Sequence, residues 1–393
     1  MHGPVLRVIE VVMMSKSAIF AVLTGFFFLA GGSTCAAVNT KPVETVREKS
    51  VLDTQDFQII DNFVAQAIQE LVRTKDLSSV SRIRTIILQN ESSNKGSAKA
   101  QYAARFFESA YKYMSEAFAE VSQLPTERQE FAITVNLLIL LDRLVANGPA
   151  NLQLADLAIA KLKDENMGVR YWAVHCVANP DFTRRLNSAE ADYSKLSSRI
   201  VEELKGLVES SSPEIMILMA QFAGDVNAPE TEELLLQMAN ARIKRYADWT
   251  VGYELLDTDI LKSLHKKISS AGTSKPALAR AFAQLYSYAI QRYVKGRDYL
   301  FSDEKQQLAS VLIETEDKCL RDVLGYRVNI RNALGRDDYE ALAAEHADLL
   351  GDKTKVGQLA KKWRFDYGQR PDGSKITEPL TLPDPPKSEP SAQ

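Results

Sequence analysis

Pairs of carboxylates are the first residues in this chain whose type and spacing could support catalysis. Glu230 with Glu233, and Asp257 with Asp259, are spaced for general acid–base work on a polysaccharide. Both pairs fall at the starts of predicted helices, where acidic side chains interact favourably with the helix dipole. We therefore favour a structural role for these acids, and an exported enzyme that acts on polysaccharide remains the alternative.

The histidines and cysteines are too few and too scattered to form a metal or nucleophile site. Beyond residue 37 the histidines are His175, His265 and His346, and His175 is adjacent to Cys176. Adjacent residues on a helix point in different directions. The zinc pair HExxH, phosphate loops, dinucleotide fingerprints and nucleophile elbows do not occur. The sequence therefore predicts no catalytic residue, no cofactor and no metal.

A basic cluster and a tyrosine stripe could instead contact a ligand along a groove. Arg242 and Arg245 lie near the end of a predicted helix, either in a solvated last turn or against an anionic partner. Tyr286 and Tyr293 share a helical face because they are seven residues apart. Such a stripe either packs in the core or lines a groove for a peptide or glycan.

The charge balance restricts the class of partner. The formal net charge is −3 and charged residues make up 25% of the chain. Nucleic acid requires a basic surface, and a polybasic membrane anchor requires clustered lysine and arginine. The sequence therefore argues against nucleic acid as the main partner and against a polybasic membrane anchor.

Residues 1–37 have the pattern of a secretory signal peptide. Lys16 precedes an apolar run over 18–30, and small residues follow up to Ala37. Cleavage after Ala36 or Ala37 fits this pattern, and Met13 or Met14 is a plausible true start. A lipid anchor on Cys35 and an uncleaved anchor are the alternatives. The chain is predicted to be exported to the bacterial periplasm or exterior, without a transmembrane span once it is mature.

The rest of the chain divides into a linker, a helical domain and a tail. Residues 38–53 are polar and predicted to form a linker, and helical periodicity continues over 54–365. Residues 366–393 are rich in proline and predicted to be disordered. Cys176 and Cys319 fall in predicted helices, and we expect two buried free thiols there, with pairing as the alternative.

Individual helices follow from the spacing of apolar residues and from capping residues. A helix is predicted over 54–72, where apolar residues recur every three or four positions. A long helix is predicted over 98–124 and ends at Pro125. The next helix begins at the capping box Thr126–Gln129 and stops at Asn147. Polar residues interrupt its apolar run, so it is predicted to be a core helix.

Residues 152–179 carry a family resemblance. A helix over 152–163 and a turn at Asp164 precede a second helix that contains Val169, Arg170 and Ala173. This order of residues resembles a HEAT repeat. The resemblance implies that the two helices pack antiparallel, that Ala173 permits their close approach, and that Asp164 and Arg170 bond near the turn and orient neighbouring repeats.

The resemblance implies an architecture for the whole helical domain. Val169 and Ile215 are 46 residues apart, which suits units of the HEAT and armadillo type. Ser210 and Met216 replace the expected aspartate and arginine in the second unit. We predict an all-α fold of stacked antiparallel helix pairs, a HEAT-like α-solenoid, with an irregular helical bundle as the alternative. The predicted function is non-catalytic protein binding or scaffolding.

Overall fold

The structure is a computed structural model, and it describes residues 38–147, 152–188, 190–270 and 275–386. From residue 39 onward the chain forms one compact unit. The predicted signal peptide and Cys35 lie outside the described residues. Among those that are described, no helix is both long and apolar enough to cross a membrane.

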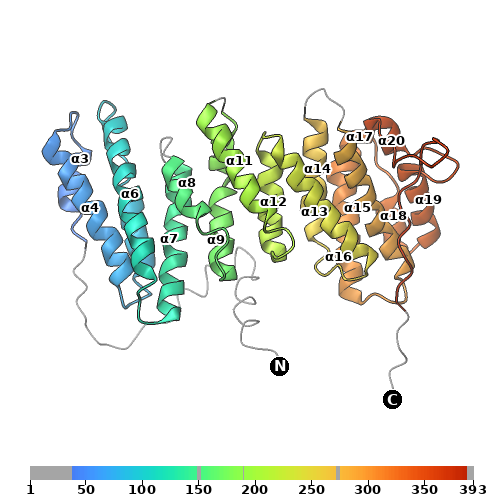
Figure 1. Cartoon of the computed structure of the whole chain (residues 1–393), viewed down its shortest axis with the longest axis horizontal. Coiled ribbons are helices and arrows are strands. Elements are labelled where there is room, and N and C mark those ends of the chain that lie inside the picture. The colour runs from blue at the N-terminus through green and yellow to red at the C-terminus, as the bar shows by residue number, and fades with distance from the viewer. Residues whose placement is uncertain (1–37, 148–151, 189, 271–274, 387–393) are drawn as a thin grey trace, which may run out of the picture. The chain divides into compact units, whose positions relative to one another are not determined.

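The described chain is all-α, and its helices pack in two layers (Figure 1). Each first-layer helix contacts the next one of that layer: α4 (Thr54–Arg73), α6 (Lys99–Val121), α8 (Leu152–Ile159), α11 (Ala191–Lys205), α13 (Glu230–Ala247), α15 (Pro276–Lys295) and α19 (Tyr339–Leu350). The second layer follows the same rule: α5 (Val80–Gln89), α7 (Glu127–Asn147), α9 (Met167–Val177), α12 (Pro213–Asp225), α14 (Leu256–Ser269) and α16 (Ser302–Thr315).

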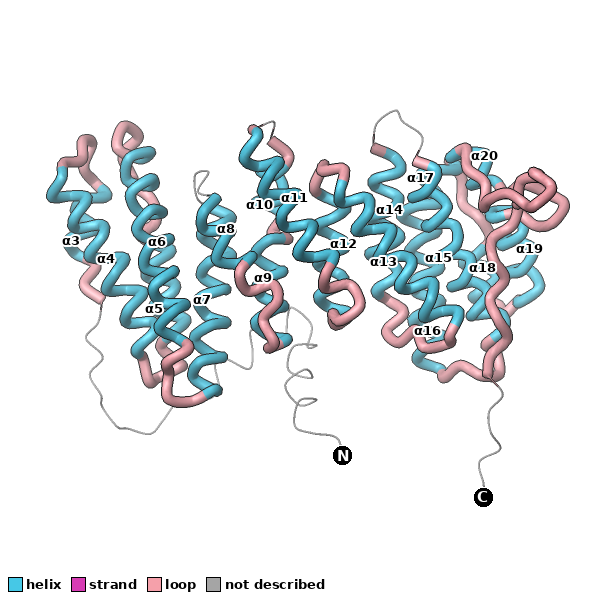
Figure 2. Tube along the Cα trace, in the orientation of Figure 1, coloured by secondary structure: helices cyan, strands magenta, loops and turns pink. Residues whose placement is uncertain are grey.

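Short helices complete the two layers (Figure 2). They are α3 (Lys41–Arg47), α10 (Pro180–Leu186), a π-helical turn (Glu316–Leu320), α17 (Arg321–Leu324), α18 (Ile330–Gly335) and α20 (Gln358–Trp363). The described part of the chain contains no strand, only isolated antiparallel bridges at Gly351–Val356 and Gln369–Lys375. The prediction of an all-α fold with packed neighbouring helix pairs is confirmed, and the type of repeat stays a prediction.

Local sequence explains where these helices begin and which side they bury. The Asp53 carboxylate accepts from the backbone N–H of Asp56, and Asp56 accepts from that of Asp53, which closes a capping box at the start of α4. The helix then buries one stripe: Ile60, Phe63, Val64, Ala67, Ile68 and Leu71. Ahead of α7 the Thr126 hydroxyl accepts from the backbone N–H of Gln129, which is one of the two hydrogen bonds of the predicted capping box.

The predicted linker over 38–53 contains a helix. Pro42 lies in the first turn of α3, where its missing N–H costs no helical hydrogen bond. Val43 and Val46 are buried, and α3 packs against α4. Two valines on one face are too few to give a periodic apolar pattern. The polar composition of the segment therefore led to the incorrect prediction of a linker.

The predicted disordered tail is also different in the structure, because residues 366–386 contact the helices. Arg280 on α15 donates to the backbone carbonyl of Asp366, and Leu382 is fully buried. Prolines interrupt the helical pattern of this segment, so disorder was predicted. In the structure, side chains of α15 form hydrogen bonds with its backbone. Residues 387–393 lie outside the described residues.

Both cysteines of the helical domain are free and buried, as predicted. The Cys176 thiol donates to the backbone carbonyl of Leu138 on α7, 3.2 Å away. Burial raises the pKa of Cys176 and that of Cys319, the latter to about 12. Both residues therefore serve as small core side chains and are poor nucleophiles.

Candidate functional site

The turn between α8 and α9 brings together the residues that carried the family resemblance. Asn166 caps α9 by accepting from the backbone N–H groups of Gly168 and Val169. Arg170 Nε donates to the backbone carbonyl of Asp164, 3.2 Å away. Arg170 Nη1 lies 3.5 Å from the backbone carbonyl of Ser210, just before α12. The arginine therefore bridges its own turn to the next helix pair, while Asp164 contributes its backbone.

Val169 and Ala173 occupy the buried side of α9. Ala173 is fully buried and Val169 nearly so. At the same end of the helix, a Cβ on Gly168 would come within 2.9 Å of the Phe131 ring on α7. The lack of a side chain at Gly168 thus allows close approach of α7 and α9.

The open side of α9 carries three aromatic rings that touch one another. The ring centroids of Tyr171 and Trp172 are 5.8 Å apart, and those of Trp172 and His175 are 5.0 Å apart. All three side chains are half-buried. Burial raises the pKa of Tyr171, and the carboxylate of Glu214 at the start of α12 raises it further. The trio therefore lies near α12 as well as on α9.

The buried Asp142 on α7 fixes the orientation of His175. Asp142 Oδ1 lies 3.1 Å from His175 Nδ1 and accepts from Asn179 Nδ2 at 2.8 Å. An aspartate–histidine pair can activate a nucleophile, but the neighbouring Cys176 thiol bonds to the backbone on the buried side. The contacts of His175 are thus those of an oriented, half-exposed aromatic side chain.

The two helices that pack against α9 in the second layer, α7 and α12, also carry half-buried apolar side chains. Because α7, α9 and α12 are successive neighbours in the second layer, their exposed sides open away from the first layer. We name this surface the α9 face and define it by Val135, Ile139, Tyr171, Trp172, His175, Ile217 and Leu218. Tryptophan and tyrosine that keep partial exposure beside apolar neighbours are typical anchors of protein interfaces.

Tyr286 and Tyr293 do not line a groove in the structure. Tyr286 is fully buried, and its hydroxyl donates to the backbone carbonyl of Leu312 on α16, 3.3 Å away. Tyr293 keeps 7% of its surface exposed and stacks on Tyr339, with centroids 5.8 Å apart. Both side chains pack between helices, which was the other interpretation of their spacing.

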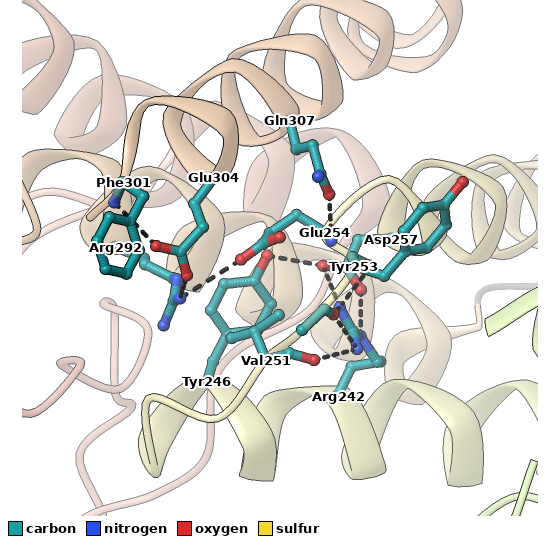
Figure 3. Close-up of polar contacts among 11 residues, drawn as sticks. Arg242, Tyr246, Val251, Tyr253, Glu254, Asp257, Arg292, Phe301, Glu304 and Gln307 are labelled. Carbon is teal, nitrogen blue, oxygen red and sulfur yellow. Dashed lines mark hydrogen bonds and ion pairs between the residues drawn. The ribbon is translucent and has the colours of Figure 1, made fainter. Parts of the chain in front are cut away.

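Arg242 is also no groove residue, because it keeps only 1% of its surface exposed. Arg242 Nε donates to Asp257 Oδ1 at 2.6 Å, and its terminal nitrogens donate to three successive backbone carbonyls, those of Val251, Gly252 and Tyr253 (Figure 3). Burial lowers the pKa of Arg242, but the Asp257 carboxylate outweighs it and the net shift is upward. Arg245, one turn further on, is half-exposed.

Arg242 holds a loop whose backbone would otherwise be unfavourable. Trp249, Gly252 and Tyr253 all have positive φ, at 57°, 53° and 40°. Such angles cost free energy in residues other than glycine. Arg242 binds the carbonyls of this loop and Asp257 binds Arg242, so these contacts stabilise the conformation of the loop between α13 and α14.

A second buried cluster adjoins the first (Figure 3). Arg292 Nη2 lies 3.4 Å from Glu254 Oε1 and 3.0 Å from Glu304 Oε1. The Arg292 guanidinium also lies over the Trp249 ring, 5.1 Å from its centroid. Burial raises the pKa of Glu254. The contacts of Arg292 link the loop, through Trp249 and Glu254, to Glu304 on α16.

The carboxylate pairs do not form an open catalytic site. Asp257 is fully buried against Arg242, and Asp259 accepts from Gln221 Nε2 at 3.3 Å. Glu230 accepts from the Ser198 hydroxyl, and Glu233 pairs with Lys205. These contacts support the structural role that we favoured for the acids.

The remaining chemistry-bearing residues are dispersed. His265 contacts Asp322, and His346 bonds to Ser287 on α15 at 2.8 Å. A hollow of about 450 Å³ beside α13 is lined by mixed polar residues that include Glu209, Glu233 and Lys244. Over the described ranges, three or more metal-ligating side chains do not gather anywhere.

Sequence reasoning missed Tyr171 and Trp172 as surface residues. Each of them is spaced to meet His175 on a helix, Tyr171 at four residues and Trp172 at three, and this signal was available. Comparison with protein-family models and with curated proteins gives no match for this chain.

Proposed function

We propose that this chain is an exported, non-catalytic scaffold of HEAT-like helix pairs that binds another protein on its α9 face. Export is supported by the pattern of residues 1–37, and the repeat type by Asp164, Val169, Arg170 and Ala173. The periplasm or exterior of a bacterium is the corresponding location.

The observation that carries the proposal is the cluster of Tyr171, Trp172 and His175. Their rings contact one another on the open side of one helix, and the two neighbouring helices also carry half-buried apolar side chains. Interfaces concentrate their binding free energy in such aromatic residues, within a rim that excludes water. Because Asp142 and the helix packing fix the cluster, a partner would bind it without a large loss of conformational entropy.

A polar ligand would need a different surface. The chain is close to neutral and the α9 face is largely apolar, so a partner would present apolar side chains of its own. Asp257 is buried in an ion pair with Arg242, which makes it a poor candidate for the acid–base role that the polysaccharide-acting alternative requires.

Affinity capture from the envelope of the native cell tests the proposal. The intact chain is compared with Trp172→Ala and Tyr171→Ala, and Phe301→Ala is the matched control because Phe301 is 79% exposed far from α9 in the chain. We expect the captured protein to be retained by the control. Loss of a hot-spot aromatic typically costs about 2 kcal/mol or more, so retention by Trp172→Ala should fall roughly thirty-fold.

Circular dichroism of each variant separates lost binding from lost folding. If a protein partner is captured equally by Trp172→Ala and by the intact chain, the α9 face is not its binding site. If envelope glycan is retained or cleaved and no protein is captured, the proposed function is wrong and the polysaccharide-acting alternative replaces it.

A further inference from the structure

The segment that follows α20 lies against α15 without forming a helix or strand of its own (Figure 2). Within it, the side chains of Pro379 and Leu382 are buried, and those of Leu380, Thr381 and Pro383 are exposed. A repeat of three residues between buried positions is that of the polyproline II helix, which proline favours. The backbone groups of that conformation make no internal hydrogen bonds, so a protein surface can bind them.

Two glutamines of α15 bind the backbone of this segment. Gln284 accepts from the N–H of Leu380 at 2.8 Å and donates to its carbonyl at 3.3 Å. Gln291 accepts from the N–H of Leu382 at 2.7 Å and donates to the carbonyl of Leu380 at 3.0 Å. Because the glutamines are seven residues apart, they lie on one side of the helix. They recognise backbone groups, which every residue except proline offers in full.

Lys295 and Trp249 extend the contact beyond Leu382. Lys295 Nζ donates to the carbonyl of Leu382 at 2.6 Å and pairs with the Asp384 carboxylate at 2.8 Å. Trp249 Nε1 donates to the carbonyl of Pro383 at 3.1 Å, and its ring meets Tyr299 edge-on. Tryptophan and tyrosine that donate to or border proline carbonyls are the usual means of recognising polyproline II segments.

This surface recognises features that are not unique to the chain's own tail. It binds two backbone N–H groups two residues apart, three carbonyls, a buried leucine and an acid. Prolines, which have no backbone N–H group, occur at 379 and 383. The site binds only the N–H groups of Leu380 and Leu382, so these prolines are compatible with it. The required ligand is thus a proline-rich segment of the form Pro-Leu-x-Leu-Pro-Asp.

The geometry points to a second binding site, formed by Gln284, Gln291, Lys295 and Trp249, for proline-rich peptide segments of a partner protein, with the chain's own residues 379–384 as its internal competitor. This α15 site is on the first layer, whereas the α9 face is on the second, so it is independent of the proposed function. The proposed ligand is a proline-rich segment of a partner protein that resembles residues 379–384. It can bind only after residues 379–384 have dissociated from the site.

The tail competes strongly because it is tethered. A short tether gives the tail an effective concentration of about 1 mM at the site. A partner segment therefore occupies the site only if its affinity and concentration are high enough to displace the tail. Release of the tail by substitution therefore should raise the apparent affinity for an added peptide. Leu382→Asp places a charge at a fully buried position and releases the tail, whereas Leu380→Asp alters a side chain that is 65% exposed and keeps it bound.

The experiment measures binding of a fluorescent synthetic peptide with the sequence of residues 376–386 to full-length variants, by anisotropy. We expect at least ten-fold tighter binding to Leu382→Asp than to the intact chain or to Leu380→Asp. Adding Gln291→Ala to Leu382→Asp should abolish the gain, because it removes the ligand of the Leu382 N–H. A peptide that carries N-methyl-leucine in place of Leu382 should also lose binding.

Equal binding to the Leu380→Asp and Leu382→Asp variants, or no binding to either, would overturn the inference. Helical circular dichroism of both variants shows whether the protein has remained folded. If Leu382→Asp unfolds the chain, displacement provides a second test: amide exchange at Leu380 and Leu382 in the intact chain should accelerate with excess peptide, and unchanged exchange contradicts the proposal. None of these substitutions touches Trp172, so this site can fail while the α9 face binds its partner.

Discussion

The two halves of the helical domain differ in how many charged side chains they bury. Up to residue 225 the described chain buries two charged side chains, Asp56 and Asp142. Beyond that point the described chain buries six: Arg242, Glu254, Asp257, Lys267, Arg292 and Glu316. The first half is therefore held together mainly by apolar packing, and the second also depends on specific pairing of buried charges.

Two arginines show what this difference means. Arg170 and Arg242 both bind backbone carbonyls near a turn between helices. Arg170 is half-exposed and water can replace its contacts, but Arg242 is buried with an aspartate that would be left unpaired without it. The same chemistry therefore has a small energetic effect in one half and a large one in the other.

Removing the Arg242 side chain should produce the largest effect. Arg242→Ala leaves Asp257 buried without its partner and frees the carbonyls of the loop, so we expect a loss of about 3–5 kcal/mol in the free energy of unfolding. Urea denaturation followed by circular dichroism measures this. Arg245→Ala, on the same helix but half-exposed, is the matched control and should change stability by about 0.5 kcal/mol or less. A loss below about 1 kcal/mol for Arg242→Ala would remove the contrast between the two halves.

His346 predicts a pH dependence that belongs to the second half. Burial lowers the pKa of His346 from 6.5 to about 4. Between these values the unfolded chain binds a proton that the folded chain does not, so the free energy of unfolding falls as the pH falls from 6.5 towards 4. From pH 7 to 4.5 the expected loss from this residue is roughly 2 kcal/mol.

Comparison with His346→Gln isolates this contribution from the titration of carboxylates. Glutamine retains a hydrogen-bonding group near Ser287 but does not titrate. The measurement is urea denaturation of both proteins at pH 7 and pH 4.5. If the two lose stability in parallel, His346 does not contribute, and the pH sensitivity of the protein lies elsewhere.

Whether the order of a segment depends on local or on distant contacts explains which parts of the fold could be predicted. The limits of α4 and α7 followed from apolar residues every three or four positions and from the capping residues before them. The helix α3 and the ordered segment over 366–386 could not be predicted in this way. Their order comes from contacts with residues far away in the chain, such as Gln284 with Leu380, and periodicity carries no such information.

The same limit applies to the candidate sites. The spacing of Tyr286 and Tyr293 correctly placed them on one side of a helix but left open which side faces solvent. That side depends on α16 and α19, which pack against α15. Arg242 resembled an exposed basic residue because its partner Asp257 belongs to the next helix. By contrast, the bond from Arg170 Nε to the backbone carbonyl of Asp164 joins residues only six positions apart, so it lies within reach of local sequence reasoning.

The smallest expected effect is that of Arg170→Ala. The side chain is half-exposed, and its bonds to the carbonyls of Asp164 and Ser210 exchange with water when it is removed. We expect a loss of about 1 kcal/mol in the free energy of unfolding. Arg184→Ala, which removes an arginine that is 77% exposed, is the control and should lose only a few tenths of a kcal/mol.

The comparison is sharpest when Arg170→Ala and Arg242→Ala are measured together. If Arg170→Ala costs as much as Arg242→Ala, the link from the α8–α9 turn to Ser210 is a principal element of the first half and not an accessory to apolar packing. Arg170→Lys then distinguishes charge from geometry, because lysine retains the charge but cannot reach two carbonyls with a planar fork. Stability restored by lysine would assign the effect to charge, and a persistent loss would assign it to the bridge between helix pairs.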